Sequence, residues 1–146
     1  MTLRRLASFA VCGAATLLGA AAISAAPQDK TTWSGIYTDA QATRGAAMYK
    51  EKCARCHADE LTGNDAPALV GGEFLGNWNG LTVNDLFERI RVSMPDDAKG
   101  TLTRPEVADG VALILQKNGM PAGETELPTD GAALSAIKFA STKPAQ

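Results

Sequence analysis

The segment Cys53-Ala54-Arg55-Cys56-His57 decides how this chain is interpreted. It places two thiols three positions apart and an imidazole directly after the second thiol. His57 is the only histidine in the sequence, and the third cysteine, Cys12, lies in an apolar leader. Because every cysteine and histidine outside that leader falls within this one segment, metal or redox chemistry is expected here.

The spacing C-x-x-C-H is the attachment motif of c-type haem. Two thiols so spaced at a helix end reach both vinyl positions along one porphyrin edge, and the adjacent histidine then lies under the iron as a nitrogen ligand. Covalent attachment also keeps the haem in a compartment where lost cofactor cannot be recovered. We therefore expect one covalent haem c per chain, attached at Cys53 and Cys56, with His57 as an iron ligand.

Three alternatives compete for the same segment. A zinc site needs about four nitrogen or sulfur ligands, so carboxylates would have to complete the set. A thioredoxin-like redox pair needs a C-x-x-C beside a βαβ pattern, which the sequence lacks. A disulfide between Cys53 and Cys56 suits an oxidising compartment, but it would close too small a loop to stabilise the fold much.

Residues 1–26 have the pattern of a cleaved secretory signal peptide. Arg4 and Arg5 give a positive start, residues 6–23 are apolar, and Ser24-Ala25-Ala26 offers a small-residue cleavage site near 24–26. A retained membrane anchor is the alternative. The leader predicts export to a bacterial periplasm, which agrees with haem c attachment, and leaves residues 27–146 as a single domain.

Composition bounds the remaining possibilities. Apolar residues make up 45% of the chain and charged residues 21%, so the chain can build a core. Aromatic residues are only 5%, which leaves room for a bulky non-protein group inside that core. The formal net charge of -2 gives no global basic field of the kind that attracts nucleic acid.

The mature chain is expected to be all-α, with three to four main helices separated by Gly/Pro loops. Thr38, Thr82 and Thr103 each stand three residues before a Gln, Asp or Glu, the pattern of a helix-capping box. Gly45 within the first helix suggests a close helix contact. We expect loops at 58–80 and 93–102, a helix end at Asn118-Gly119, and a short, weaker helix over 129–139.

A second axial iron ligand must come from methionine, because the chain has no second histidine. Met48 lies on the same helix as Cys53 and is tied to the wrong side of the haem. Met94 and Met120 are both followed by proline, so the local motif does not separate them. Met94 is favoured because it lies in a loop between two helices that can fold over the open haem face, whereas Met120 suits packing in a turn.

From Trp33 to about Leu127 the chain resembles the class I c-type cytochromes. It is especially similar to small periplasmic cytochromes, and cytochrome domains, that accompany quinoprotein (pyrroloquinoline quinone) dehydrogenases. The residues that carry the resemblance are Gln41-Ala42-x-Arg44-Gly45-x-x-x-Tyr49-x-x-x-Cys53-Ala54-x-Cys56-His57, Leu61-x-Gly63, Pro67-Ala68-Leu69-x-Gly71, Phe74, Trp78 and Met94-Pro95.

This resemblance implies a cytochrome c-like fold wrapped around the haem, with His57 as the proximal and Met94 as the distal ligand. The Pro67 carbonyl would accept a hydrogen bond from the His57 ring. Leu69, Phe74 and Trp78 would line the pocket, and the Trp78 indole would reach a haem propionate. Gly45 and Tyr49 would cross the helix around Leu113.

The chain departs from the resembled pattern at a few packing positions. Family members often carry a tyrosine near Leu113, a glycine where Ala58 stands and an aromatic residue where Met120 stands.

These expectations imply a periplasmic one-electron carrier and not an enzyme. His/Met ligation fills all six iron positions, and the only histidine is already used. The expected partners are redox proteins: a periplasmic dehydrogenase as donor, and an oxidase or another cytochrome as acceptor. Two alternatives stay open, a haem subunit of a dehydrogenase complex and a haem-based peroxidase or gas-binding protein.

Overall fold

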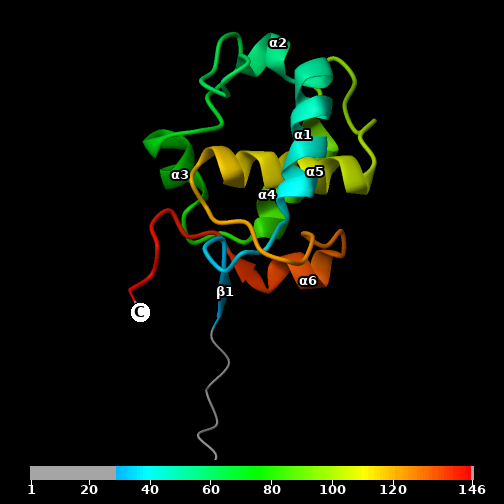
Figure 1. Ribbon diagram of the computed structural model, residues 1–146. Coiled ribbons are helices and arrows are strands. Elements are labelled where there is room, and N and C mark those ends of the chain that lie inside the picture. Colours follow the sequence, from blue (N-terminus) through cyan, green and yellow to red (C-terminus); the bar gives the residue numbers. More distant parts are fainter. Residues whose placement is uncertain (1–28, 146) are drawn as a thin grey trace, which may run out of the picture.

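Two fourteen-residue helices frame the fold in the computed structural model, which describes residues 29–145 (Figure 1). Helix α1 (Asp39–Lys52) crosses α5 (Arg104–Lys117), and this is the most extensive contact between elements of the described chain. Gly45 lies at the crossing, where a Cβ atom would stand 2.0 Å from the Asp109 carbonyl oxygen. The expected close helix contact at Gly45 is therefore confirmed.

Shorter elements surround this crossing within the described residues (Figure 1). They are α2 (Ala54–His57), α3 (Gly72–Trp78), α4 (Val83–Ser93), α6 (Gly131–Ser135) and two strands, β1 (Lys30–Thr31) and β2 (Ile137–Lys138). The strands pair in parallel, with Lys30 opposite Ile137, and join the two ends of the domain. The fold is thus all-α, as predicted, and this minimal strand pair is the only sheet in residues 29–145.

The three helices begin after the three threonines that the sequence indicated as caps, but one of the three capping boxes is incomplete. Thr82 and Thr103 form complete capping boxes with Asp85 and Glu106. Thr38 also caps its helix, accepting from the Gln41 backbone N–H at 3.1 Å, but the Gln41 side chain does not return the bond.

Gln41 is instead buried and joined to a distant segment. Its side-chain amide donates to the Leu127 carbonyl oxygen at 3.2 Å, and its Oε1 accepts from the Leu127 N–H at 2.8 Å. Because the nitrogen and the oxygen of this side-chain amide are both shielded from water, each needs a hydrogen-bond partner. The Leu127 backbone satisfies both atoms, whereas a capping-box bond to the Thr38 N–H would satisfy only the oxygen. The residue therefore fastens the segment after α5 to the start of α1.

Two expected boundaries were wrong. The loop expected over 58–80 contains α3, because Phe74 and Trp78, four residues apart on that helix, pack together with ring centroids 6.1 Å apart. The last helix is shorter than the expected 129–139: it ends at Ser135, and the chain then leaves it to form β2 against β1.

The expected ends elsewhere are confirmed: α4 ends at Ser93, and α5 ends at Lys117 before Gly119, whose φ is +79°. The signal peptide expected over 1–26 lies outside the described residues. Within residues 29–145, no helix combines the length and the apolar character needed to cross a bilayer.

The α1–α5 contact predicts a strong effect of Gly45→Ala. The new methyl would overlap the Asp109 carbonyl oxygen, which belongs to a backbone that cannot move without displacing α5. We expect a loss of about 3 kcal/mol in the free energy of unfolding of the holoprotein, measured by urea denaturation.

Gly76→Ala on α3 is the matched control. A Cβ there would meet no atom within 4 Å, and Gly76 does not line the large cavity. The free energy of unfolding of this variant should therefore change by less than about 1 kcal/mol. Equal effects of the two substitutions would show that the crossing does not require glycine.

Candidate functional site

The C-x-x-C-H segment forms a tight turn directly after α1. The Cys53 N–H donates to the Tyr49 carbonyl oxygen at 2.8 Å, which ends α1, and the Cys53 carbonyl oxygen then accepts from the N–H groups of Cys56 and His57 at 3.1 and 3.0 Å. These bonds make α2 a single helical turn. The turn carries both thiols and the imidazole on one short, backbone-bonded unit.

This unit forms one end of a cavity of about 780 Å³ with a largely apolar lining. All eight residues expected to hold or contact the haem line it: Cys53, Cys56, His57, Pro67, Leu69, Phe74, Trp78 and Met94. They come from α2, the loop after it, α3 and the end of α4. The structure therefore brings together residues that are far apart in sequence, around a space with two thiols, an imidazole and a thioether in its wall.

The His57 ring has a fixed orientation. Its side chain lies in the cavity wall, with the residue 8% exposed, and its Nδ1 atom is 2.8 Å from the Pro67 carbonyl oxygen. A carbonyl oxygen only accepts hydrogen bonds, so Nδ1 carries the hydrogen and donates it. The lone pair is then on Nε2, the nitrogen that suits an iron ligand.

Backbone bonds hold Pro67 where His57 can reach it. The Ala66 N–H donates to the Cys56 carbonyl oxygen and the Gly63 N–H donates to the His57 carbonyl oxygen, both at 3.0 Å. Gly63 has a φ of +84°, and a Cβ there would lie 2.8 Å from the Ala68 nitrogen. The loop after the motif is thus tied back onto α2.

The structure places Met48, Met94 and Met120 in different surroundings. Met94 lines the cavity at the end of α4, where its N–H donates to the Ile90 carbonyl oxygen at 2.9 Å. Met120 is buried in the core, 2% exposed, and does not line the cavity. Met48, set aside from the sequence, also lines the cavity, with its methyl group directed toward Gly110.

The local chemistry does not favour a redox dithiol or a zinc site. Burial raises the pKa of the Cys53 thiol to about 11, whereas reactive C-x-x-C thiols have lowered pKa values. Both cysteines are unbridged. Within residues 29–145, no group of three or more His, Cys, Asp or Glu side chains is arranged to hold a metal ion. The thiols, the imidazole and the apolar wall fit a covalent haem instead.

Sequence patterns missed part of the lining. Leu86, Arg89 and Ile90 of α4 also face the cavity, at the i, i+3, i+4 spacing of one helix face. The four-residue spacing of Leu86 and Ile90 is typical of a helix face, but nothing in the sequence shows that this face borders a cavity. Phe74 was expected there and is 5% exposed, packed against Trp78 and Phe139.

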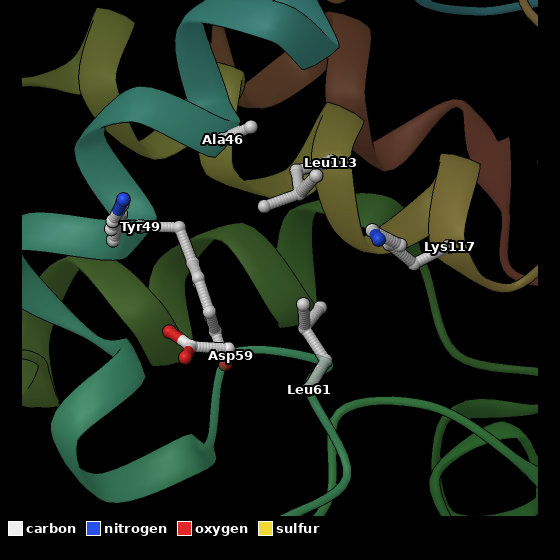
Figure 2. Close-up of a pocket in the computed structure, with 7 residues that line it drawn as sticks. Ala46, Tyr49, Asp59, Leu61, Leu113 and Lys117 are labelled. Carbon is white, nitrogen blue, oxygen red and sulfur yellow. The ribbon is translucent and has the colours of Figure 1, made fainter.

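A second, smaller cavity of about 270 Å³ lies beside the α1–α5 crossing (Figure 2). Figure 2 shows Leu113 of α5 and Leu61 of the loop beside the Tyr49 ring, with Lys117 at the edge. Tyr49 lines both cavities, so its ring forms part of the wall between them. The hollow adjoins Leu113, near which the resembled cytochromes often carry a larger tyrosine.

Tyr49 also holds the chain immediately after the motif. Its hydroxyl donates to the Ala58 carbonyl oxygen at 2.7 Å, and burial raises the pKa of Tyr49, which keeps that donor protonated. Ala58 adopts φ 64° and ψ 157°, a conformation that is essentially restricted to glycine. The alanine in place of the usual glycine therefore strains the turn that follows His57.

Comparisons with known proteins bear on this site. A family model described as "Cytochrome C oxidase, cbb3-type, subunit III" matches residues 40–114, about half of the chain. No curated protein sequence gives a significant match. Among solved structures, the sulfane dehydrogenase SoxCD from Paracoccus pantotrophus is similar at 21% identity and a TM-score of 0.44. The match covers 75% of this chain and 62% of the SoxCD chain, so this chain spans less than two thirds of the length of the SoxCD chain.

The backbone of Ala58 predicts a stabilising substitution. Ala58→Gly removes the steric conflict at positive φ while keeping the carbonyl that Tyr49 binds. We expect the free energy of unfolding of the holoprotein to rise by about 1 kcal/mol, measured by urea denaturation.

Ala47→Gly, on the exposed face of α1, is the control. There glycine costs helix stability and should lower the free energy of unfolding by about 1 kcal/mol. If both substitutions destabilise the protein to the same extent, the turn at Ala58 is not strained.

Proposed function

This chain belongs to the c-type cytochromes, in the family described as subunit III of cbb3-type cytochrome c oxidase, and we propose that it is a periplasmic mono-haem electron carrier. The observation that carries the proposal is the cavity whose wall includes both thiols, the His57 ring and the Met94 side chain. When bound, haem c supplies a reversible one-electron iron couple.

The residues of the cavity wall would hold the haem in different ways. Cys53 and Cys56 would form the thioether bonds, and His57 would bind the iron through Nε2 because its Nδ1–H is directed at Pro67. Met94, at the end of α4, would supply a thioether sulfur as the second protein ligand. Leu69 and Trp78 contribute apolar wall that limits the access of water. A low-dielectric pocket with two protein ligands favours electron transfer without substrate binding at iron.

A catalytic role is less well supported by the residues at the cavity. Peroxide reduction needs an open iron position and an acid–base group above it, and the only histidine of the chain is turned toward Pro67. The lining carboxylates Asp96 and Asp97 belong to the exposed rim, where they pair with Lys99 at 2.9 Å and Arg55 at 2.7 Å. They are held as surface ion pairs, which suits docking better than proton transfer.

We propose that the partners are exported redox proteins: a periplasmic dehydrogenase that donates electrons, and an oxidase or another cytochrome that accepts them. The rim around Arg55 and Asp97 is mixed in charge and exposed, which suits small, transient contacts. Export rests on the signal-peptide pattern of residues 1–26, with a cut near 24–26 and residues 27–146 as the mature single domain.

The test of the carrier hypothesis is the visible spectrum of the dithionite-reduced holoprotein before and after carbon monoxide. The wild-type spectrum should not change, because His57 and Met94 would both be bound to the iron and leave no position for carbon monoxide. Met94→Leu should give a rapid and complete CO-bound spectrum, since leucine keeps the apolar volume but offers no sulfur.

Two methionine variants serve as controls. Met120→Leu, in the core, and Met48→Leu, in the cavity wall, should both stay unreactive toward carbon monoxide. A CO-bound spectrum from the wild-type protein would refute the carrier hypothesis and favour gas binding or peroxide reduction. If carbon monoxide bound only to Met48→Leu, or only to Met120→Leu, the methionine replaced in that variant would be the distal ligand instead of Met94.

A further inference from the structure

The cations that line the large cavity differ in whether they are already paired. Lys52 Nζ lies 2.6 Å from Glu106 Oε1, and Arg55 Nη2 lies 2.7 Å from Asp97 Oδ2. Arg89 lines the same cavity but makes no ion pair with any residue in 29–145. Its neighbour Glu88 is already shared between Arg91, at 2.7 Å, and Arg104, at 3.0 Å.

Helix geometry directs Arg89 toward the cavity edge. Leu86 and Ile90 lie on the same face of α4 and also line the cavity, so the Arg89 stem runs beside apolar wall. The residue as a whole is exposed. This is the usual arrangement of a long cationic side chain that covers apolar surface with its stem and keeps its charged head in water. The guanidinium group is therefore available at the rim.

The positions of the acidic propionate groups on haem indicate which of these cations can pair with them. Haem carries its two vinyl positions on one edge and its two propionate carboxylates on the opposite edge, so attachment at Cys53 and Cys56 turns the propionates away from those cysteines. Lys52 directly precedes Cys53, and Arg55 directly precedes Cys56. Each is already in an ion pair, Lys52 with Glu106 and Arg55 with Asp97. Arg89 comes from a different element, α4, and has no carboxylate partner among the described residues.

We propose that Arg89 binds a haem propionate and so fixes the charge at the edge of the cofactor opposite the thioethers. The proposal rests on the proposed haem attachment at Cys53 and Cys56. A planar guanidinium binds a carboxylate through two parallel hydrogen bonds, which a water-exposed rim permits. A propionate so paired stays ionised at lower pH and its negative charge is partly neutralised near the iron.

The test compares the midpoint potential of the purified holoprotein as a function of pH in Arg89→Gln, Arg89→Lys and the wild type. Ionisation of a propionate favours ferric iron, so the potential falls as pH rises through the propionate pKa. A carboxylate beside an arginine has a pKa about 1–3 units lower than an unpaired one, so Arg89→Gln should move this fall upward by about 1–3 pH units. Arg89→Lys should lie between Arg89→Gln and the wild type.

Arg91→Gln is the matched control, because it removes the same charge from the same helix at a residue that pairs with Glu88 and does not line the cavity. Its profile should superimpose on that of the wild type. The other charged groups of the cavity lining, Lys52, Arg55, His57, Asp65, Glu73, Asp96 and Asp97, are unchanged in all variants, so differences report on residue 89.

Two outcomes would overturn the proposal: an Arg89→Gln profile identical to the wild type, or an equal displacement in Arg91→Gln. Failure of the haem hypothesis is recognised separately, from the reduced spectrum and covalent haem content of the wild type before any variant is measured. A variant that keeps the wild-type spectrum and CO behaviour but shifts its pH profile supports the propionate contact alone.

Discussion

The contact of two backbones at Gly45 and Asp109 is the constraint on which the rest of the molecule depends. It fixes α1 against α5, and α1 ends at the residue that begins the C-x-x-C-H turn. Tyr49, one turn after Gly45, then reaches beyond the turn to the Ala58 carbonyl. The position of both thiols therefore follows from a helix crossing that only a missing side chain allows.

The cavity explains why so small a core suffices for this domain. The apolar faces of α3, α4 and α5 converge on a space of about 780 Å³ that no side chain fills. The covalent haem of the family supplies that volume, and most of its contacts would be apolar ones of the kind that stabilise protein interiors. The low aromatic content is consistent with a cofactor that replaces aromatic side chains in the core.

How far the sequence predicts the structure depends on whether the responsible interaction is local. The motif at 53–57 and the caps at Thr82 and Thr103 depend on residues a few positions apart, and these were predicted. Gln41 was misassigned because its partner, Leu127, is remote in sequence and burial decides between the two bonds.

The same argument accounts for the missed parts of the site. Helix α3 contains Gly72 and Gly76, which suggest a loop, yet the packing of Phe74 on Trp78 and Phe139 outweighs that weak helix propensity. No motif in the sequence singles out Arg89, and only the cavity beside α4 suggests a role for it. For both α3 and Arg89, contacts with parts of the chain that are distant in sequence decide the outcome, and the residue types alone do not.

The two proposed iron ligands, His57 and Met94, both lie at helix ends, and this would favour electron transfer over ligand exchange. His57 belongs to a turn bonded to the end of α1, and its ring is fixed by Pro67 at 2.8 Å. Met94 is the capping residue of α4, with its N–H bonded to Ile90. Neither ligand depends on an ion pair: the rim pair Arg55–Asp97 is exposed at both side chains and contributes at most about 1 kcal/mol. Because backbone hydrogen bonds and helix packing set the positions of both proposed ligands, a change in the charge of a bound iron should require little movement of the protein.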